Sequence, residues 1–169
     1  IAICGYGPVG STFAGLMGRL GHKVLVIEKS IGPSPTARAI NTDGEQLRTF
    51  DRLGIAEKVV ENSTEVHRVH FGDANLNPIQ TIEQPVGVSV MGLPKQVLFY
   101  QPELEGFIRT SVESESNIVI EEGTELLSFD DTPEGVTLNC KNSDGDLSFF
   151  SKYLIGCDGA SSFVRKELD

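Results

Sequence analysis

The first 28 residues contain two short apolar runs, and the segment between them has apolar residues at helical spacing. Residues 1–4 (IAIC) form a short apolar run, and the glycine-rich stretch GYGPVG follows it directly. Apolar side chains then recur at helical spacing up to Gly21, at Val9, Phe13, Leu16, Met17 and Leu20. A second apolar run, KVLVIE, occupies residues 23–28. The order of strand, glycine turn, helix and strand predicts a βαβ unit with parallel strands.

The middle of the chain is less regular. Residues 29–41 are rich in Pro, Ser and Gly and read as a loop. The stretch TDGE then predicts a helix start, because Thr42 and Glu45 have the spacing of a capping box, and the helix should end at Gly54. Between residues 65 and 100, glycine, proline and asparagine separate three pieces typical of strands, EVHRVHFG, VGVSVM and QVLFY.

A third helix is predicted over residues 101–112 (QPELEGFIRTSV), with Pro102 in its first turn. Four successive strands should follow, in NIVIEE, TELLSFDD, GVTLNCKN and LSFFSKYLIGC, with turns at DDTPEG and NSDGD. The last residues, SSFVRKELD, are in helical register. The pattern as a whole predicts an α/β fold in which a parallel sheet is joined to an antiparallel β-meander.

Composition limits the kinds of partner that the protein can have. The 169 residues suit one domain, and 39% of them are apolar, enough for a packed core. Fourteen basic against 24 acidic side chains leave a net charge of −10, which disfavours a nucleic-acid partner. No apolar run approaches the roughly 20 residues that span a bilayer. We therefore expect a cytoplasmic protein with no membrane partner.

Cysteine and histidine spacing does not indicate a metal site. Cys4, Cys140 and Cys157 are widely separated, so we interpret them as reduced and mostly buried thiols. His67 and His70 lie in a stretch that alternates like a strand, which places residues three apart on opposite faces. No metal is expected.

The glycine stretch matches a dinucleotide-binding pattern. Gly5 would permit a tight turn, Gly7 would let the backbone approach a pyrophosphate, and Gly10 would allow close packing of helix and strand. Glu28 ends the second strand, where a carboxylate can accept hydrogen bonds from an adenosine ribose and disfavours a 2′-phosphate. FAD or NAD is therefore expected rather than NADP. Taken alone, the glycines could mark only a turn, and Glu28 could be a solvated acid.

A later segment favours FAD. In YLIGCDGASSFVR an apolar strand carries Asp158 and Gly159 at its carboxyl end, the end where open α/β sheets bind ligands. By itself Asp-Gly is a common turn.

With these segments together, the chain resembles the single-component FAD-dependent aromatic hydroxylases, or class A flavoprotein monooxygenases. The stretches that carry the resemblance are GYGPVGSTFAGLMGRLG with VLVIEK, ARAINTDGEQLRTFDRLG, YQPELEGFI and YLIGCDGASSFVR. Hydroxylases of 3-(3-hydroxyphenyl)propionate and related phenols look most similar, with polyketide and rifampicin hydroxylases beside them. The resemblance implies a Rossmann-like FAD-binding domain over residues 1–169, with residues about 65–100 contributing to a substrate-domain sheet. Because the family's later Gly-Asp segment has no counterpart, we expect the N-terminal portion of a longer monooxygenase.

The resemblance also implies roles for individual residues. The pyrophosphate would be lined by Gly5, Gly7, Pro8, Val9 and Gly10, and the adenosine ribose by Glu28 and Lys29. Arg38 and Gln101 would face the ribityl and phosphate region, Leu126 would contact the adenine, and Asp158 would support the pyrophosphate. The alternatives are a solvated loop charge for Arg38, a helix cap for Gln101 and a core position for Leu126.

The implied reaction is hydroxylation of a small phenolic or other aromatic substrate, with FAD, NAD(P)H and dioxygen, through a flavin C4a-hydroperoxide. The cofactor supplies this chemistry, so we name no catalytic side chain. Residues 29–60 contain no cysteine, which excludes a disulfide reductase. A halogenase, a prenyl reductase and a non-catalytic nucleotide-binding module remain alternatives, and the resemblance leaves a homodimer open.

Overall fold

The computed structural model describes residues 1–84, 86–90 and 92–168. The chain divides into two compact units, the first made of Ile1–Pro35 with Ile108–Asp169, and the second of Thr36–Phe107. The long helix α4, Gln101–Glu113, contributes its first residues to the second unit and its remainder to the first.

A parallel sheet forms the centre of the first unit, with strand order β12-β1-β2-β8. Its strands are β1 (Ala2–Cys4), β2 (Val24–Glu28), β8 (Ile118–Glu122) and β12 (Leu154–Gly156). Every neighbouring pair is parallel, so the carboxyl ends of all four strands meet at one edge. This arrangement confirms the predicted βαβ unit and brings the Asp158 segment beside the glycine turn.

Helix α1, Pro8–Arg19, connects β1 to β2 and buries a face that the apolar spacing did not indicate. Its buried positions carry small side chains or none: Gly10, Ser11, Thr12, Ala14, Gly15 and Gly18. Val9 and Leu20 from the predicted apolar stripe are 71% and 69% exposed. A Cβ on Gly18 would lie 2.6 Å from the Cδ1 atom of Ile118 in β8. The helix therefore packs on the sheet through its smallest residues, at a distance that larger side chains would prevent.

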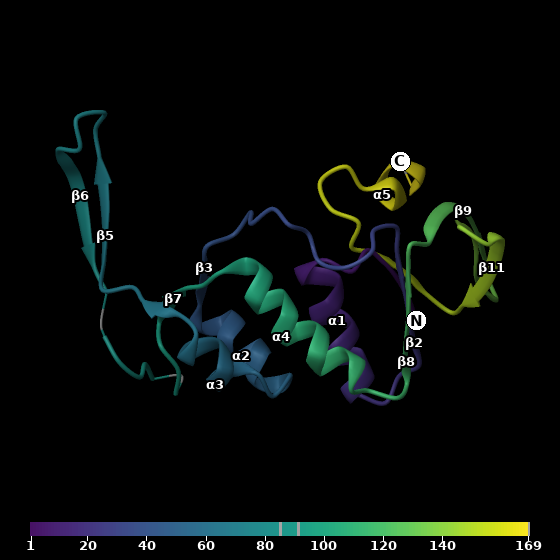
Figure 1. Cartoon of the computed structure of the whole chain (residues 1–169), viewed down its shortest axis with the longest axis horizontal. Coiled ribbons are helices and arrows are strands. Elements are labelled where there is room, and N and C mark those ends of the chain that lie inside the picture. Colours follow the sequence, from purple (N-terminus) through teal and green to yellow (C-terminus); the bar gives the residue numbers. More distant parts are fainter. Residues whose placement is uncertain (85, 91, 169) are drawn as a thin grey trace. The chain divides into compact units, whose positions relative to one another are not determined.

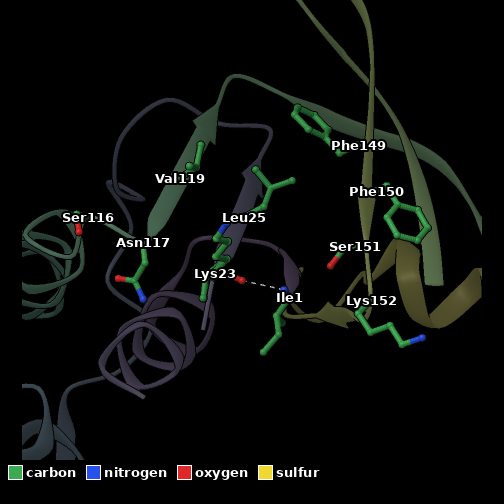
Figure 2. Close-up of a pocket in the computed structure, with 11 residues that line it drawn as sticks. Ile1, Lys23, Leu25, Ser116, Asn117, Val119, Phe149, Phe150, Ser151 and Lys152 are labelled. Carbon is green, nitrogen blue, oxygen red and sulfur yellow. Dashed lines mark hydrogen bonds between the residues drawn. The ribbon is translucent and has the colours of Figure 1, made fainter. Parts of the chain in front are cut away.

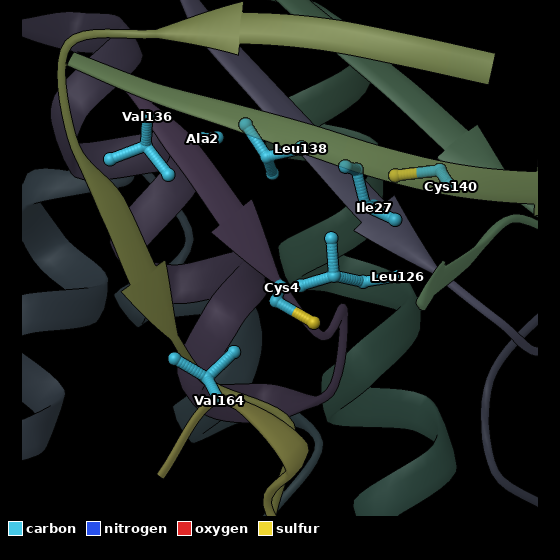
Figure 3. Packing of buried hydrophobic residues seen from close by; sticks show 8 residues of the cluster. All are labelled: Ala2, Cys4, Ile27, Leu126, Val136, Leu138, Cys140 and Val164. Atoms are coloured by element: carbon cyan, nitrogen blue, oxygen red, sulfur yellow. The ribbon is translucent and has the colours of Figure 1, made fainter. Parts of the chain in front are cut away.

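The antiparallel sheet of the first unit has the order β11-β10-β9. Its strands are β9 (Glu125–Thr132), β10 (Gly135–Asn142) and β11 (Gly145–Ser151). Ala2, Cys4 and Ile27 of the parallel sheet pack against Leu138 and other apolar side chains of this sheet (Figure 3). Figure 1 shows α1 on the opposite face of the parallel sheet. The segment predicted as one strand, LSFFSKYLIGC, is divided between β11 and β12, and α5 (Phe163–Leu168) follows.

The second unit combines short helices with short strands. Its helices are α2 (Gly44–Arg52) and α3 (Ala56–Glu61), and its small sheet has the order β3-β7-β4, from β3 (Asn41–Asp43), β7 (Gln96–Leu98) and β4 (Thr64–Glu65). The predicted capping box is wrong in detail, because Thr42 lies in β3 and Asp43 caps α2 by accepting from the Gln46 N–H at 2.9 Å. The side chain adjacent to the first helical residue, one position later than predicted, makes the cap.

The strand predictions between residues 65 and 100 need correction. His67 lies outside any strand, whereas His70 belongs to β5 (Arg68–Gly72), which pairs with β6 (Pro78–Glu83), a strand that the sequence did not predict. Residues 86–90 of the expected strand VGVSVM contain only an isolated bridge from Val88 to Pro94, and Met91 lies outside the described residues.

Candidate cofactor site

The glycine turn between β1 and α1 can be built only with glycine at two of its positions. Gly5 has φ of +101°, and a Cβ there would lie 2.9 Å from the Cα atom of Asp158 and closer still to the Cys157 carbonyl. A Cβ on Gly10 would overlap the carbonyl oxygen of Gly5. Both glycines therefore allow backbone segments to touch: Gly10 brings α1 against the turn, and Gly5 brings the turn against the segment after β12.

The start of α1 is open beside this turn. Gly7 is the N-cap residue and supplies no side-chain hydrogen bond, and Pro8 follows as the first helical residue. A Cβ on Gly7 would meet no atom within 4 Å. The amide groups of a first helical turn and the helix dipole favour an anion. The backbone at Gly7 can therefore be approached closely by a phosphate.

Glu28 ends β2 at the same edge of the sheet and binds two backbone amides. Its Oε2 atom accepts from the Tyr6 N–H at 2.8 Å, and its Oε1 atom accepts from the Ser30 N–H at 2.8 Å. An ionised carboxylate has about four acceptor positions. Glu28 therefore fixes the glycine turn and the loop after β2, and retains acceptor capacity for a further donor. Lys29, the next residue, is exposed.

Asp158 caps helix α5 with both carboxylate oxygens. Its Oδ1 accepts from the Ser162 hydroxyl at 2.5 Å, while Oδ2 accepts from the N–H groups of Phe163 at 2.6 Å and Val164 at 3.1 Å. Burial raises the pKa of Asp158, but the hydrogen bonds from Ser162 and the backbone amides outweigh this effect and hold the pKa below its usual value. The carboxylate orders the segment that lies against Gly5, and its direct support of a pyrophosphate stays a prediction.

Leu126 lies in β9 with its side chain in the core. It is 6% exposed and belongs to the cluster with Cys4 and Ile27 (Figure 3). This burial agrees with the core alternative for the side chain, and its contact with an adenine stays a prediction.

Arg38 and Gln101 lie together in the second unit. The buried side chain of Gln101 accepts through Oε1 from the N–H groups of Arg38 at 2.5 Å and Ala39 at 2.8 Å. Its amide nitrogen donates to Oε1 of the buried Glu105 at 2.7 Å. Gln101 therefore holds the 38–39 segment against α4, while Arg38 is exposed.

Three residues beside the glycine turn were missed by the sequence analysis: Tyr6, Arg109 and Glu122. The guanidinium of Arg109 lies over the Tyr6 ring, 4.3 Å from its centroid, and its Nη1 atom lies 2.6 Å from Oε1 of Glu122. Burial raises the pKa of the Tyr6 phenol despite the nearby Arg109 charge, which lowers it, so this hydroxyl is neutral at physiological pH. The only signal in the sequence was the large side chain of Tyr6 between two glycines. Its partners Arg109 and Glu122 lie more than 100 positions away along the chain, so no local pattern indicated them.

A pocket of about 650 Å³ lies away from this site (Figure 2). Its lining includes Ile1, Lys23 and Asn117, which directly precede β1, β2 and β8. It therefore opens at the amino ends of the parallel strands, the end opposite to the glycine turn, and we assign it no part in cofactor binding.

Residues 1–84, 86–90 and 92–168 contain no group of three or more His, Cys, Asp or Glu side chains arranged to hold a metal ion. Within the same ranges, every helix is too short or too polar to cross a membrane.

The chain is similar to a known family and to curated proteins. The model of the FAD binding domain family matches residues 1–169. The 3-(3-hydroxy-phenyl)propionate/3-hydroxycinnamic acid hydroxylase of Escherichia coli (strain K12 / DH10B) is 32% identical over 170 residues, which cover 100% of this chain and 30% of that protein. The chain thus spans about 30% of the length of this curated relative.

Solved structures agree on the fold. The flavin-dependent monooxygenase PieE, in complex with FAD and substrate, has a TM-score of 0.86 and 26% identity, over 99% of this chain and 31% of that one. The p-nitrophenol 4-monooxygenase PnpA from Pseudomonas putida DLL-E4 has a TM-score of 0.89 over 99% of this chain and 42% of that one, and at 23% identity it shows the fold alone. The family model, the curated hydroxylase and PieE confirm the resemblance to the FAD-dependent aromatic hydroxylases. Because the family model matches the whole chain, the protein belongs to the FAD binding domain family.

Proposed function

We propose that this chain holds the adenosine diphosphate half of FAD in a monooxygenase that hydroxylates a phenolic or other aromatic substrate. The observation that carries the proposal is the turn from Gly5 to Gly10, where contacts that only glycine permits leave the start of α1 open at the carboxyl edge of the parallel sheet. A dinucleotide pyrophosphate fits such a helix start.

The residues present fit FAD at this edge. A pyrophosphate would lie over Gly7 and the first turn of α1, where Pro8 and Val9 are exposed and backbone amides are the donors. The free acceptor positions of Glu28 would receive the ribose hydroxyls, with Lys29 beside them. Gly5 and Gly10 would act by shaping the turn.

The remaining predicted residues would support or border the bound cofactor. Asp158 would support the pyrophosphate through the α5 cap that it makes, and Leu126 would border the adenine. Arg38 and Gln101 would face the ribityl and phosphate region. The hydrogen bonds from the Arg38 and Ala39 N–H groups to Gln101 fix the backbone from which the Arg38 side chain extends.

Bound FAD would supply the redox chemistry, taking electrons from NAD(P)H and transferring one atom of dioxygen to the substrate ring. The chain itself would bind and orient the cofactor. The relatives named as hydroxylases and monooxygenases support this reaction class, and the phenylpropionate hydroxylase supports a small phenolic substrate. Residues about 65–100, which include β5, β6 and β7, would contribute to the substrate-domain sheet of the complete protein.

Equilibrium dialysis of the complete protein against FAD and NAD tests the cofactor. Retention of FAD and not of NAD is expected, and retention of NAD without flavin would refute the proposal. Addition of NADPH or NADH with 3-(3-hydroxyphenyl)propionate in air tests the reaction, with the product identified by a mass increase of one oxygen atom. A protein that binds FAD and oxidises neither nucleotide with any phenol would instead be a non-catalytic binding module.

A further inference from the structure

Three charged side chains and one tyrosine form a network beside the glycine turn in the first unit. It consists of Tyr6 in the turn, Glu28 at the end of β2, Arg109 in α4 and Glu122 at the end of β8. Tyr6 is 1% exposed, and the side chains of Arg109 and Glu122 are 11% and 28% exposed. An ion pair with this burial is shielded from solvent and salt more than a surface pair is.

Arg109 joins the turn to a second loop. Its Nη2 atom donates to the carbonyl oxygen of Tyr6 at 3.3 Å, while Nη1 donates to Oε1 of Glu122 at 2.6 Å. The same Glu122 oxygen accepts from the Gly32 N–H at 3.1 Å, in the loop that follows β2. A continuous path of contacts therefore runs from the glycine turn through Arg109 and Glu122 to Gly32.

Glu28 makes a second, parallel connection between the same two loops, because it accepts from both Tyr6 and Ser30. In the proposed function, the glycine turn holds the pyrophosphate and the loop after β2 borders the adenosine ribose. The distance between the two loops must therefore match the distance between two parts of one ligand.

The Arg109 side chain is poorly explained by stability alone. Its Nε atom is buried and has no hydrogen-bond partner among the described residues. An apolar side chain of similar length would pack against the Tyr6 ring without leaving a buried donor unsatisfied. A planar guanidinium is, however, the side chain that can reach a carbonyl and a carboxylate together while it lies over an aromatic ring.

Resting on the proposed function, we infer that Arg109 is a positioning residue for FAD: through Tyr6 and Glu122 it sets the separation of the glycine turn from the loop after β2. Arg109 acts through the backbone that binds the ligand and not by contact with it. Loss of Arg109 leaves each loop formed and Glu28 as the remaining connection between them. The separation of the two loops is then fixed less closely, so the affinity for a ligand that spans both falls.

The test compares FAD dissociation constants, measured by flavin fluorescence on the complete protein well below its melting temperature. Arg109→Met should raise the dissociation constant at least tenfold, because the methionine fills the space without bridging the loops. Arg109→Lys should give an intermediate value, since an ammonium keeps the charge but lacks the planar fork. Glu122→Gln should raise the constant in the same direction, and it decides the question if Arg109→Met does not fold.

Arg19→Met is the matched control. It removes another arginine–glutamate pair of the first unit, Arg19 with Glu115 at 3.3 Å, from the opposite end of α1. It should leave the FAD dissociation constant within twofold of the wild type, whatever its effect on the melting temperature.

The outcomes separate this inference from the proposed function. Wild-type protein that binds no FAD overturns both. Wild-type protein that binds FAD, with Arg109→Met or Glu122→Gln binding it equally well, overturns the positioning role alone. Equal loss of affinity in Arg19→Met also overturns it, because the effect would then follow general destabilisation.

Discussion

A single added methyl group should have different effects at two glycines of the same turn. At Gly10 it should lower the stability of the fold, and at Gly7 it should weaken FAD binding. In Gly10→Ala the new Cβ would overlap the carbonyl oxygen of Gly5 and lie 3.2 Å from the Cys157 Cβ atom. A backbone carbonyl cannot rotate away as the end of a flexible side chain can, so α1 or the turn must shift. We expect a loss of about 1–3 kcal/mol in the free energy of unfolding, the usual range for overpacking.

Gly7→Ala should leave the fold unchanged. Gly7 has φ of −75° and ψ of −173°, an extended conformation that alanine adopts freely, and its Cβ would meet no atom within 4 Å. The free energy of unfolding should stay within about 0.5 kcal/mol of the wild type. The methyl group would, however, stand where the pyrophosphate is proposed to approach. The FAD dissociation constant should therefore rise at least about tenfold, equivalent to about 1.4 kcal/mol.

Two measurements on each variant separate these effects. Thermal unfolding of the apoprotein, followed by circular dichroism, should show a lower melting temperature for Gly10→Ala only, by roughly 2–4 °C for each kcal/mol. Titration with FAD should show weaker binding by Gly7→Ala. Gly106→Ala in α4, whose Cβ would also meet no atom within 4 Å, is the control that should change neither affinity nor fold.

Each variant can contradict its own prediction. If Gly7→Ala binds FAD as the wild type does, the pyrophosphate does not pass over Gly7. If Gly10→Ala melts at the wild-type temperature, α1 does not approach the turn as closely as the structure has it.

Three further predictions concern side chains of the first unit. Glu28→Ala should weaken FAD binding by about 1–3 kcal/mol, since ribose hydroxyls lose a charged acceptor; calorimetric titration checks this, and an unchanged dissociation constant would leave Glu28 with only its backbone contacts. Asp158 has a lowered pKa in the fold, so its stabilising effect is present above the unfolded-state pKa and is lost as the pH falls through the folded value. Asp158→Asn should consequently flatten the acid side of the stability–pH profile measured by urea unfolding, and an identical profile would contradict the α5 cap. Burial raises the pKa of Cys4 to about 12 and that of Cys140 to about 11, so both thiols should resist a disulfide reagent at pH 8 until urea unfolds the protein; rapid labelling of either in the native state would contradict their burial.

The elements that the sequence predicted best are those whose signals are local. The run at residues 1–4, the glycines up to Gly10 and the run at residues 23–28 lie within one short stretch, and the structure confirms the strand, turn, helix and strand that they indicate. The meander was predictable for the same reason, because the turns between β9, β10 and β11 connect neighbours in the chain. Weak or competing local signals gave the errors between residues 65 and 100, where β6 was missed.

Burial was harder to predict than secondary structure. Of the five positions that the apolar spacing indicated, Val9 in α1 and Leu20 directly after it are exposed, and the other three are only partly buried. The buried face of α1 is made of glycine, alanine, serine and threonine. The sheet behind this helix approaches so closely that size, and not hydrophobicity, selects the residues at the contact. The periodicity of apolar residues shows which face of a helix is apolar. It contains no information about the distance between the helix and the sheet.

By itself the sequence determined the βαβ unit, the glycine turn and the position of Glu28 at a strand end, since each follows from the conformational freedom of glycine and from short apolar runs. Tertiary structure alone decided which groups meet behind the turn. Arg109 lies 103 positions from Tyr6, and Glu122 lies 90 positions from Gly32. They meet because β2 and β8 pair in parallel and α4 immediately precedes β8 along the chain. Contacts over such separations depend on how strands and helices pack, and no local pattern of polar and apolar residues encodes them.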